Sequence, residues 1–383
     1  MTVRKTSGDD IRGLVLAGVH AWGRSAFERL LPLPLMPLAD SPLICYALRW
    51  LRDANVTSTV ICANSESRPV RHVLGDGVAL GLDLCYYEDI PPRGPAGCVH
   101  DSGSQWPARD LVVVEGSIIP ALDLHALLEE HRQTGAIMTI AVEQSHEQTD
   151  SATAFLCPVG VYVVAERALN RISPVGYQDI KEVLIPALHD AGEQVRFYQT
   201  DEASPRVAGL ATYMLAHEWA CERLAAGTNP LPTYHRHGQA LVHEQAEVAR
   251  DAEVIGPVLI GPGTRIAPRA TIIGPTAIGQ DCTMEEDTVV CRSAIWDRCV
   301  IERGSRVDHC LLAFEAQVKP GICLRDTLHV HNVQRGARRS PLGQTAHPDP
   351  TAPGQHDAAS RIAQPGEDRD VPPVLKERAD HAA

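Results

Sequence analysis

Residues 254–290 read VIGPVLIGPGTRIAPRATIIGPTAIGQDCTMEEDTVV, and every sixth position of this stretch carries an apolar side chain. The same spacing begins earlier and, after a slip of one residue, continues later, at Val248, Val254, Ile260, Ile266, Ile272, Ile278, Met284, Val290, Ile295, Ile301 and Val307. A six-residue repeat with glycines at its turns is typical of a parallel β-helix, in which stacking buries the aliphatic side chains. The pattern therefore predicts a β-helix over residues 247–333.

The residues before the repeat alternate two kinds of segment. Residues 42–54 carry apolar side chains at helical spacing. Short apolar runs of strand length occupy 14–17, 59–62, 82–87, 111–114, 138–142 and 161–164. Strands that alternate with helices predict an α/β domain over residues 11–228, with a mostly parallel sheet covered on both faces. Ligands of such sheets bind beyond the carboxyl ends of the strands. Gly116 and Ser117 follow one predicted strand, so we expect the site near them.

The other parts of the chain are predicted to connect or extend these two domains. Residues 1–10 form an N-terminal extension, and the polar stretch 229–246, which contains Pro230 and Pro232, forms a linker. From 334 to 383 the chain is rich in proline, glycine, alanine and charged residues, a composition that cannot bury enough apolar surface to fold by itself. We therefore expect a disordered tail there.

Charge and composition argue against several classes of function. The net charge of −13 argues against binding to nucleic acid. No apolar run approaches the roughly 20 residues that a membrane-spanning helix needs. The N-terminus lacks a secretory pattern, so we expect a cytoplasmic protein without membrane contact. The eleven cysteines include no Cys-x-x-Cys pair, which favours buried thiols over disulfide bonds.

Histidines and cysteines give no pattern typical of a metal site. His235, His237 and His243 lie close together in the predicted linker, but no cysteine or carboxylate stands at a matching spacing. We therefore expect these histidines to be solvated and expect no zinc. His125 and His131 are predicted on the exposed surface of a helix. A last group of cysteines is expected to fill the interior or the corners of the β-helix: Cys282, Cys291, Cys299, Cys310 and Cys323.

Several short motifs follow one another along the chain in a specific order. The segment LVVVEGSII at 111–119 precedes an amphipathic stretch and GAIMTI at 135–140. The other motifs are PLADSPLI at 37–44, LGDG at 74–77, GPAG at 94–97, GVY at 160–162 and DI…IPAL at 179–188. Together with the hexapeptide repeats, these motifs resemble the sugar-1-phosphate nucleotidyltransferases, or nucleotide-sugar pyrophosphorylases, such as mannose-1-phosphate guanylyltransferases. The resemblance implies a Rossmann-like nucleotidyltransferase domain with a mixed sheet, followed by a left-handed parallel β-helix.

The reaction that this resemblance implies brings two anions together. A phosphate oxygen of a sugar 1-phosphate attacks the α-phosphorus of a nucleoside triphosphate, and pyrophosphate leaves. The site must therefore supply positive charge and in-line positioning. In the family, a glycine-rich loop, an arginine in that loop and the lysine of a Pro-Lys-Pro motif meet the phosphates. Two aspartates hold Mg²⁺ against them.

This chain departs from the family at each of these features. The loop after the first strand keeps Gly18, Gly23 and Arg24 but lacks the tight glycine pattern. The positions of the implied lysine and of the two implied aspartates fall at or near Leu33, Ser117 and Val207. A neutral hydroxyl is a poor ligand for a hard cation. We therefore expect no intact catalytic residue and no cofactor, with Mg²⁺ required only if the protein is active.

A binding pocket can persist after its chemistry is lost. The residues that we expect to contact a nucleotide or a sugar are Gly18, Gly23, Arg24, Asp89, Gly94, Gly97, Gly116, Ser117, Gly160 and Asp179. Among them, Asp89 stands where the family often carries a glutamine that reads the base.

Three functions remain open. The first is a catalytically degenerate pyrophosphorylase homologue, which binds a nucleotide sugar as a regulatory or scaffolding subunit in nucleotide-sugar or polysaccharide biosynthesis. Such a subunit is expected to form a homo-oligomer, or a hetero-oligomer with an active paralogue. The second is an active nucleotidyltransferase that makes an NDP-sugar through the substitute residues Arg24, Asp89 and Asp179. The third is a hexapeptide acyltransferase, whose candidate histidines are His309, His329 and His331.

Overall fold

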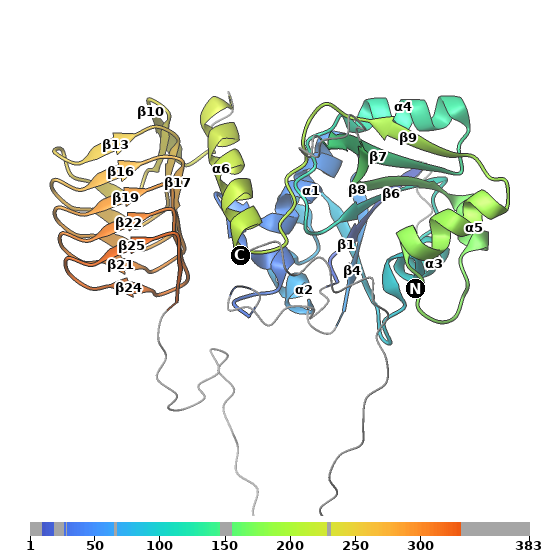
Figure 1. The fold of residues 1–383 in the computed structure, drawn as a ribbon, viewed down its shortest axis with the longest axis horizontal. Helices are drawn as coiled ribbons and strands as arrows, with labels where there is room; N and C mark the ends of the chain where they lie inside the picture. Colours follow the sequence, from blue (N-terminus) through green and yellow to red (C-terminus); the bar gives the residue numbers. More distant parts are fainter. Residues whose placement is uncertain are drawn as a thin grey trace, which may run out of the picture. The chain divides into compact units, whose positions relative to one another are not determined.

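The computed structural model describes residues 10–18, 27, 29–64, 67–145, 155–227 and 231–330 (Figure 1). All of these residues belong to one compact unit, residues 1–332. The predicted disordered tail and nearly all of the predicted N-terminal extension lie outside the described residues, as do Gly23, Arg24 and His331. Within the described part of the chain, no helix combines the length and the apolar character needed to span a membrane.

The N-terminal domain is built on a seven-stranded mixed sheet. Its strands are β1 (Ile11–Leu16), β4 (Ser58–Ala63), β5 (Asp83–Glu88), β6 (Asp110–Glu115), β7 (Met138–Ser145), β8 (Phe155–Ala165) and β9 (Val195–Gln199), in the order β5-β4-β1-β6-β8-β7-β9. The first four strands of this order run parallel. β8 runs antiparallel to β6 and β7, and β9 runs parallel to β7. Every apolar run that predicts a strand forms one, so the predicted mostly parallel sheet is confirmed.

Helices cover both faces of this sheet (Figure 1). They are α1 (Leu43–Asp53), α2 (Pro69–Leu74), α3 (Gly94–Gln105), α4 (Leu124–Thr134) and α5 (Ile185–Asp190), whereas a sixth helix, α6 (Leu210–Ala226), packs against strands of the C-terminal repeat region. The shorter elements are η1 (Leu33–Leu35), β2 (Pro37–Leu38), β3 (Ser41–Pro42), η2 (Val78–Leu80), η3 (Glu166–Arg171) and η4 (Ile180–Leu184). Val112 and Val114 of β6 pack into one core with α1 and α4, whereas Leu111 and Val113 pack into another with α3 and α5. This strand is therefore buried on both sides, as central parallel strands are.

One face of α4 packs against the sheet. Leu124, Leu128 and His131 follow the spacing of a single helix face, and all three are buried. The prediction that His131 is exposed is therefore wrong. Its side chain is 3% exposed, and its Nδ1 atom lies 2.7 Å from Thr139 Oγ1. His125 lies off this face and is exposed, as predicted.

The repeat region forms a parallel β-helix, as predicted, and Figure 1 shows its coils stacked on one another. Its strands are β10 (Tyr234–His237), β11 (Ala240–His243), β12 (Glu247–Val248), β13 (Glu253–Ile255), β14 (Val258–Ile260), β15 (Arg265–Ile266), β16 (Thr271–Ile273), β17 (Thr276–Ile278), β18 (Thr283–Met284), β19 (Val289–Cys291), β20 (Ala294–Ile295), β21 (Val300–Ile301), β22 (Arg306–Asp308), β23 (Leu311–Leu312), β24 (Gln317–Val318), β25 (Cys323–Arg325) and β26 (Leu328–His329). They form three sheets, ordered β10-β11-β14-β17-β20-β23-β26, β12-β15-β18-β21-β24 and β13-β16-β19-β22-β25.

The apolar positions of the repeat fill the interior of the β-helix. From Ile260 to Val307 each of them is at most 2% exposed. The slip of one residue in the sequence is a change in coil length. Leu259 pairs with Ala277, eighteen residues further on, and Ala277 pairs with Ala294, seventeen residues further on. The shorter coil keeps the apolar positions stacked.

Two details of the β-helix add to the sequence-based predictions. Part of the stretch predicted as a linker forms the hairpin of β10 and β11, and β11 pairs with β14. Among the cysteines, Cys282, Cys299 and Cys310 are buried as expected, and Cys291 is half-buried. The expectation is wrong for Cys323, which is exposed. Strand residues alternate between faces, and its neighbour in β25 is the one that packs inward.

α6 joins the two domains. Tyr213 of this helix donates a hydrogen bond to the Pro37 carbonyl at 2.6 Å and accepts one from Trp296 Nε1 at 3.0 Å. Pro37 lies in the N-terminal domain and Trp296 in the β-helix, so one hydroxyl connects both. His217, one turn further along α6, is 2% exposed, and burial lowers its pKa to about 4. This interface therefore contains a neutral histidine at neutral pH.

Candidate functional site

A cavity of about 360 Å³ opens at the carboxyl ends of β1 and β6. It is lined by Leu16, Gly18, Leu33, Pro34, Pro95, Glu115, Gly116, Ser117, Tyr162, Asp179, Ile180 and Lys181. This is the edge at which parallel α/β sheets bind their ligands. Five of the residues that the sequence singles out come together here: Gly18, Leu33, Gly116, Ser117 and Asp179.

Gly116 allows the ends of two strands to meet at this cavity. Its N–H group donates a hydrogen bond to the Leu16 carbonyl at 2.9 Å. A Cβ atom on Gly116 would lie 2.8 Å from that oxygen. A side chain at this position would therefore push β6 away from β1 at the rim of the cavity.

Glu115 is the acidic centre of the cavity and is held by three partners. It forms an ion pair with Arg206, accepts a hydrogen bond from the Tyr162 hydroxyl at 3.0 Å, and lies 3.7 Å from Lys181 Nζ. Burial would raise the pKa of Glu115, but Arg206 and Lys181 hold it below its ordinary value. Burial and the Glu115 carboxylate raise the pKa of Tyr162. At neutral pH the cavity therefore contains a carboxylate and a protonated phenol.

Arg206 lies beside Ser117 because the backbone of residues 206–207 pairs with the backbone of residues 117–118. The Val207 N–H group donates a hydrogen bond to the Ser117 carbonyl at 2.8 Å, and Ile118 pairs with Arg206 as an isolated bridge. Arg206 Nη1 then lies 3.3 Å from Ser117 Oγ. Val207, which stands near the implied second aspartate, is 1% exposed and packs into the core. The side chain that contacts the lining residues Glu115 and Ser117 at this point is the arginine.

Gly160 provides the space for this ion pair. Its φ angle is +90°, a conformation that favours glycine. A Cβ atom on Gly160 would lie 2.7 Å from Arg206 Nη2 and 3.0 Å from the carboxyl carbon of Glu115. Gly160 therefore borders the charged cluster and makes room for it.

Asp179 begins the helical segment that carries Lys181. Its Oδ1 atom accepts hydrogen bonds from the N–H groups of Lys181 at 2.6 Å and of Glu182 at 2.9 Å. Such a cap fixes the start of a helix. It also points Asp179 and Lys181 toward the same cavity, since both residues line it.

A second, smaller cavity of about 50 Å³ adjoins the first and shares Leu16, Gly18 and Pro95 with it. Asp89 and Gly94, two of the predicted binding residues, contribute to its lining. The Asp89 side chain is buried and accepts a hydrogen bond from the Arg93 N–H group at 2.7 Å. The candidate base-reading position is thus a carboxylate at the edge of this second cavity.

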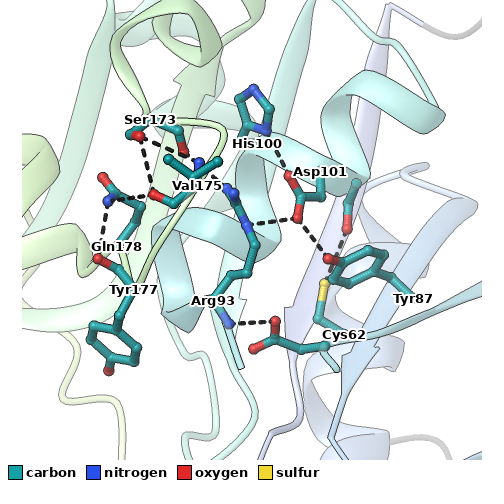
Figure 2. A network of polar contacts seen from close by, with 11 residues as sticks. Cys62, Tyr87, Arg93, His100, Asp101, Ser173, Val175, Tyr177 and Gln178 are labelled. Atoms are coloured by element: carbon teal, nitrogen blue, oxygen red, sulfur yellow. Dashed lines mark hydrogen bonds and ion pairs between the residues drawn. The ribbon is translucent and has the colours of Figure 1, made fainter. Parts of the chain in front are cut away.

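A polar network holds Arg93, the residue that precedes α3 (Figure 2). Asp101 accepts a hydrogen bond from the Tyr87 hydroxyl at 2.6 Å and lies 2.9 Å from Arg93 Nε. Arg93 also donates to the Ser173 carbonyl at 3.0 Å. Gly94 has a φ of +80°, and a Cβ there would lie 2.7 Å from the Gln178 carbonyl. The start of α3 is therefore fixed against residues 173–178.

The remaining predicted residues do not join these cavities. Gly97 lies in α3, where a Cβ would meet the Arg93 side chain at 2.5 Å, so its role is close packing. Gly23 and Arg24 fall outside the described residues. Four residues of the charged cluster are not among the residues predicted from the sequence: Glu115, Tyr162, Lys181 and Arg206. Two of these have a visible signal, because Glu115 directly precedes Gly116 and Lys181 follows Asp179 by two residues.

The residues present do not fit the Mg²⁺ ion that the family resemblance implies. A hard cation prefers several anionic oxygens. Glu115 is paired with two cationic side chains, Asp179 uses one oxygen as a helix cap, and Ser117 is neutral. Over the described ranges, no three His, Cys, Asp or Glu side chains are grouped so that they could hold a metal ion.

Comparisons with known proteins agree with this architecture. A family model described as Nucleotidyl transferase matches residues 28–151. A mannose-1-phosphate guanylyltransferase from Mycobacterium tuberculosis is 24% identical over 258 aligned residues, covering 62% of this chain and 71% of that protein. A glucose-1-phosphate thymidylyltransferase from Streptomyces griseus is 26% identical over 316 aligned residues, covering 73% of this chain and 85% of that protein.

A solved structure described as a glucose-1-phosphate thymidylyltransferase from Bacillus anthracis matches 55% of this chain and 95% of that chain, at a TM-score of 0.49 and 16% identity. The relation to nucleotidyl transferases is supported by the sequence relatives and by the seven-stranded sheet. Residues 28–151 form a nucleotidyl transferase domain, and the chain is a homologue of mannose-1-phosphate guanylyltransferases and glucose-1-phosphate thymidylyltransferases.

Proposed function

We propose that this protein is a catalytically degenerate homologue of the nucleotide-sugar pyrophosphorylases. It binds a nucleotide sugar and acts in the cytoplasm as a regulatory or scaffolding subunit in nucleotide-sugar or polysaccharide biosynthesis. The names of its relatives point to GDP-mannose and dTDP-glucose as ligands. Its partner is an active paralogue or a second copy of the chain.

The observation that supports the loss of catalysis best is the Glu115–Arg206 ion pair beside Ser117. In this corner the family resemblance implies aspartates and a divalent cation, whereas the chain has a hydroxyl and a guanidinium. The Arg206 charge would repel a metal dication at such short range. Leu33 adds a second loss, since it lines the cavity where a lysine is implied. Removal of a single electrostatic contributor can lower a rate by roughly 10²–10³.

Retention of a binding site is supported by the cavities themselves. Two adjoining cavities lie at the carboxyl ends of the strands and share part of their lining. The polar network behind Gly94 and the cap at Asp179 hold both walls in place. A cavity that is fixed in this way can hold a ligand without catalysing its reaction.

An active nucleotidyltransferase is the second candidate, and one observation favours it. Glu115, Asp179 and Lys181 line a single cavity, so two carboxylates and a cation from unexpected positions lie near one another. The acyltransferase hypothesis has no comparable support in the described residues. His309 lies 2.7 Å from an oxygen of Asp326, and His329 contacts the Gln317 carbonyl at 3.0 Å, so separate contacts hold the two histidines.

Release of pyrophosphate separates the first two candidates. The purified full chain would be mixed with Mg²⁺, with GTP, dTTP or UTP, and with mannose 1-phosphate or glucose 1-phosphate. We expect pyrophosphate at the level of the protein-free control, while an active relative assayed in parallel turns over. Sustained turnover that is abolished by Glu115→Gln would establish the active enzyme instead.

Binding and partnership are tested separately. A ligand that binds only the folded chain raises its apparent melting temperature. We expect GDP-mannose or dTDP-glucose to do so. Co-expression with an intact paralogue should then yield a complex on gel filtration, and the nucleotide sugar should change the paralogue's rate only when this chain is present. An unchanged rate in the complex would contradict the regulatory role.

A further inference from the structure

We propose that the cavity binds the phosphates of its ligand without a metal ion, and that Lys181 and Arg206 supply the positive charge. The inference rests on the proposed function, because it concerns how the same cavity holds a nucleotide sugar. It differs from the family resemblance, which implies that a divalent cation held by two aspartates binds the phosphates.

The first step is the position of the two cations. Lys181 lines the cavity and lies 3.7 Å from Glu115 on one side. Arg206 pairs with the same carboxylate from the other side and contacts Ser117 Oγ at 3.3 Å. Its side chain is 37% exposed, so the contacts with Glu115 and Ser117 leave part of it accessible. A guanidinium offers five N–H donors in a planar fork that matches phosphate geometry.

The second step is the charge of the cavity. Its lining contains two carboxylates, Glu115 and Asp179, and one cation, Lys181. Without Arg206 this lining would carry a net negative charge and would repel a diphosphate. Arg206 neutralises Glu115, which is the task that a divalent cation performs where carboxylates and phosphates meet. A metal ion beside Arg206 would instead add like charges in a partly buried place.

The backbone around Arg206 leaves space for its side chain and holds it in place. Gly160 leaves the space in which Arg206 Nη2 lies, because a Cβ there would approach it to 2.7 Å. The Val207 N–H group fixes the adjacent backbone to the Ser117 carbonyl at 2.8 Å. Arg206 Nη2 also donates to the Val159 carbonyl at 3.4 Å. These contacts come from three segments, so Arg206 is held in the site and is not a free surface side chain.

Glu115 gives the sharpest test, because the two binding modes make opposite predictions for it. If Glu115 helped to hold a metal ion, replacing it would weaken binding. If Lys181 and Arg206 bind the phosphates directly, Glu115 competes with the ligand for them. The Glu115→Gln variant should then bind roughly tenfold more tightly, since one negative charge leaves a partly buried site.

The experiment is isothermal titration calorimetry of the full chain with GDP-mannose and with dTDP-glucose, in EDTA and in Mg²⁺. For the wild-type chain we expect dissociation constants that agree within about twofold in the two buffers. Lys181→Gln and Arg206→Gln should each weaken binding by roughly 10- to 100-fold, the range for one charge-assisted hydrogen bond. Matched controls are Lys319→Gln and Arg298→Gln, which remove the same charges from exposed ion pairs on the β-helix. These controls should bind like the wild-type chain.

The outcomes separate the two proposals. Binding that requires Mg²⁺, or that weakens in Glu115→Gln, overturns metal-free recognition and leaves nucleotide-sugar binding intact. Failure of both ligands to bind in either buffer overturns the proposed function together with this inference. If Arg206→Gln does not fold, Lys181→Gln and Glu115→Gln still decide the question, because both keep the Arg206 side chain and its contacts with Ser117 and the Val159 carbonyl.

Discussion

Acidification is expected to weaken the contact between α6 and the β-helix through one buried histidine. His217 is 2% exposed, and burial lowers its pKa to about 4 although the Ser293 carbonyl favours the charged form. In the unfolded chain a histidine has a pKa of about 6.5. The unfolded chain therefore binds the proton more tightly, and stability that is complete above about pH 6.5 is lost as the pH falls toward 4.

The size of this loss follows from the two pKa values. One pKa unit corresponds to about 1.4 kcal/mol, so the full difference amounts to roughly 3 kcal/mol by pH 4. At pH 5 the histidine would already cost roughly 2 kcal/mol of the free energy of unfolding. For a chain of 383 residues, whose entropy of unfolding is roughly 0.7–0.8 kcal/mol/K, that loss lowers the melting temperature by about 3 °C.

Melting curves of the full chain at pH 7.5 and pH 5 measure the effect. The perturbing variant is His217→Leu, in which a side chain of similar size cannot titrate. We expect the wild-type chain to lose about 3 °C more than this variant between the two pH values. His125→Leu makes the same substitution at an exposed position and should fall in parallel with the wild type. Equal losses in the wild type and in His217→Leu would refute the reasoning.

Two further predictions concern space in the site and packing in the β-helix. Gly160→Ala should lower the free energy of unfolding by about 1–3 kcal/mol more than Gly192→Ala, in urea melts. Both glycines have positive φ, but only at Gly160 would the new Cβ meet Arg206. Equal losses of stability in the two variants would show that the clash with the Glu115–Arg206 ion pair contributes nothing to the cost. Ile301→Ala removes a fully buried side chain and should cost about 2–5 kcal/mol. Ile322→Ala, at a position 44% exposed, should cost much less, and a similar loss would contradict the assigned interior.

The architecture could be predicted because burial leaves a periodic trace in the sequence. The β-helix interior takes one apolar residue in six, and even the slip before Ile295 corresponds to a shorter coil. The central strands appear as uninterrupted apolar runs because both of their faces are buried. His131 was misjudged because its burial depends on a partner, Thr139 Oγ1, which belongs to a neighbouring strand. The spacing of His131 from Leu124 and Leu128 places it on the buried face of α4 and is the sequence feature that indicates its burial.

The site could be predicted only in part, because its charges come from distant segments. The stretch around Gly116 and Ser117 identified the correct edge of the sheet. Arg206, however, lies 89 residues from Ser117 in the sequence and is brought beside it by the backbone contacts of residues 206–207 with residues 117–118. Motif comparison records that an aspartate is missing near Val207. The motifs do not reveal that Arg206, the residue before Val207, contacts Ser117 and pairs with Glu115.

The glycine motifs and the charged positions therefore report different properties. At Gly116 and Gly94 a Cβ atom would approach a carbonyl oxygen to 2.8 Å or less, so the fold requires glycine at both positions whether or not a reaction occurs. The presence of these two glycines therefore supports the fold, and it does not indicate whether the protein is catalytically active. Ser117 lines the cavity and Arg206 contacts it, and a change of side chain at either position alters the electrostatics there and leaves the sheet unchanged. A family member can thus keep glycines such as Gly116 and Gly94 while its charges are rearranged, and only the charges indicate whether a metal ion can still bind there.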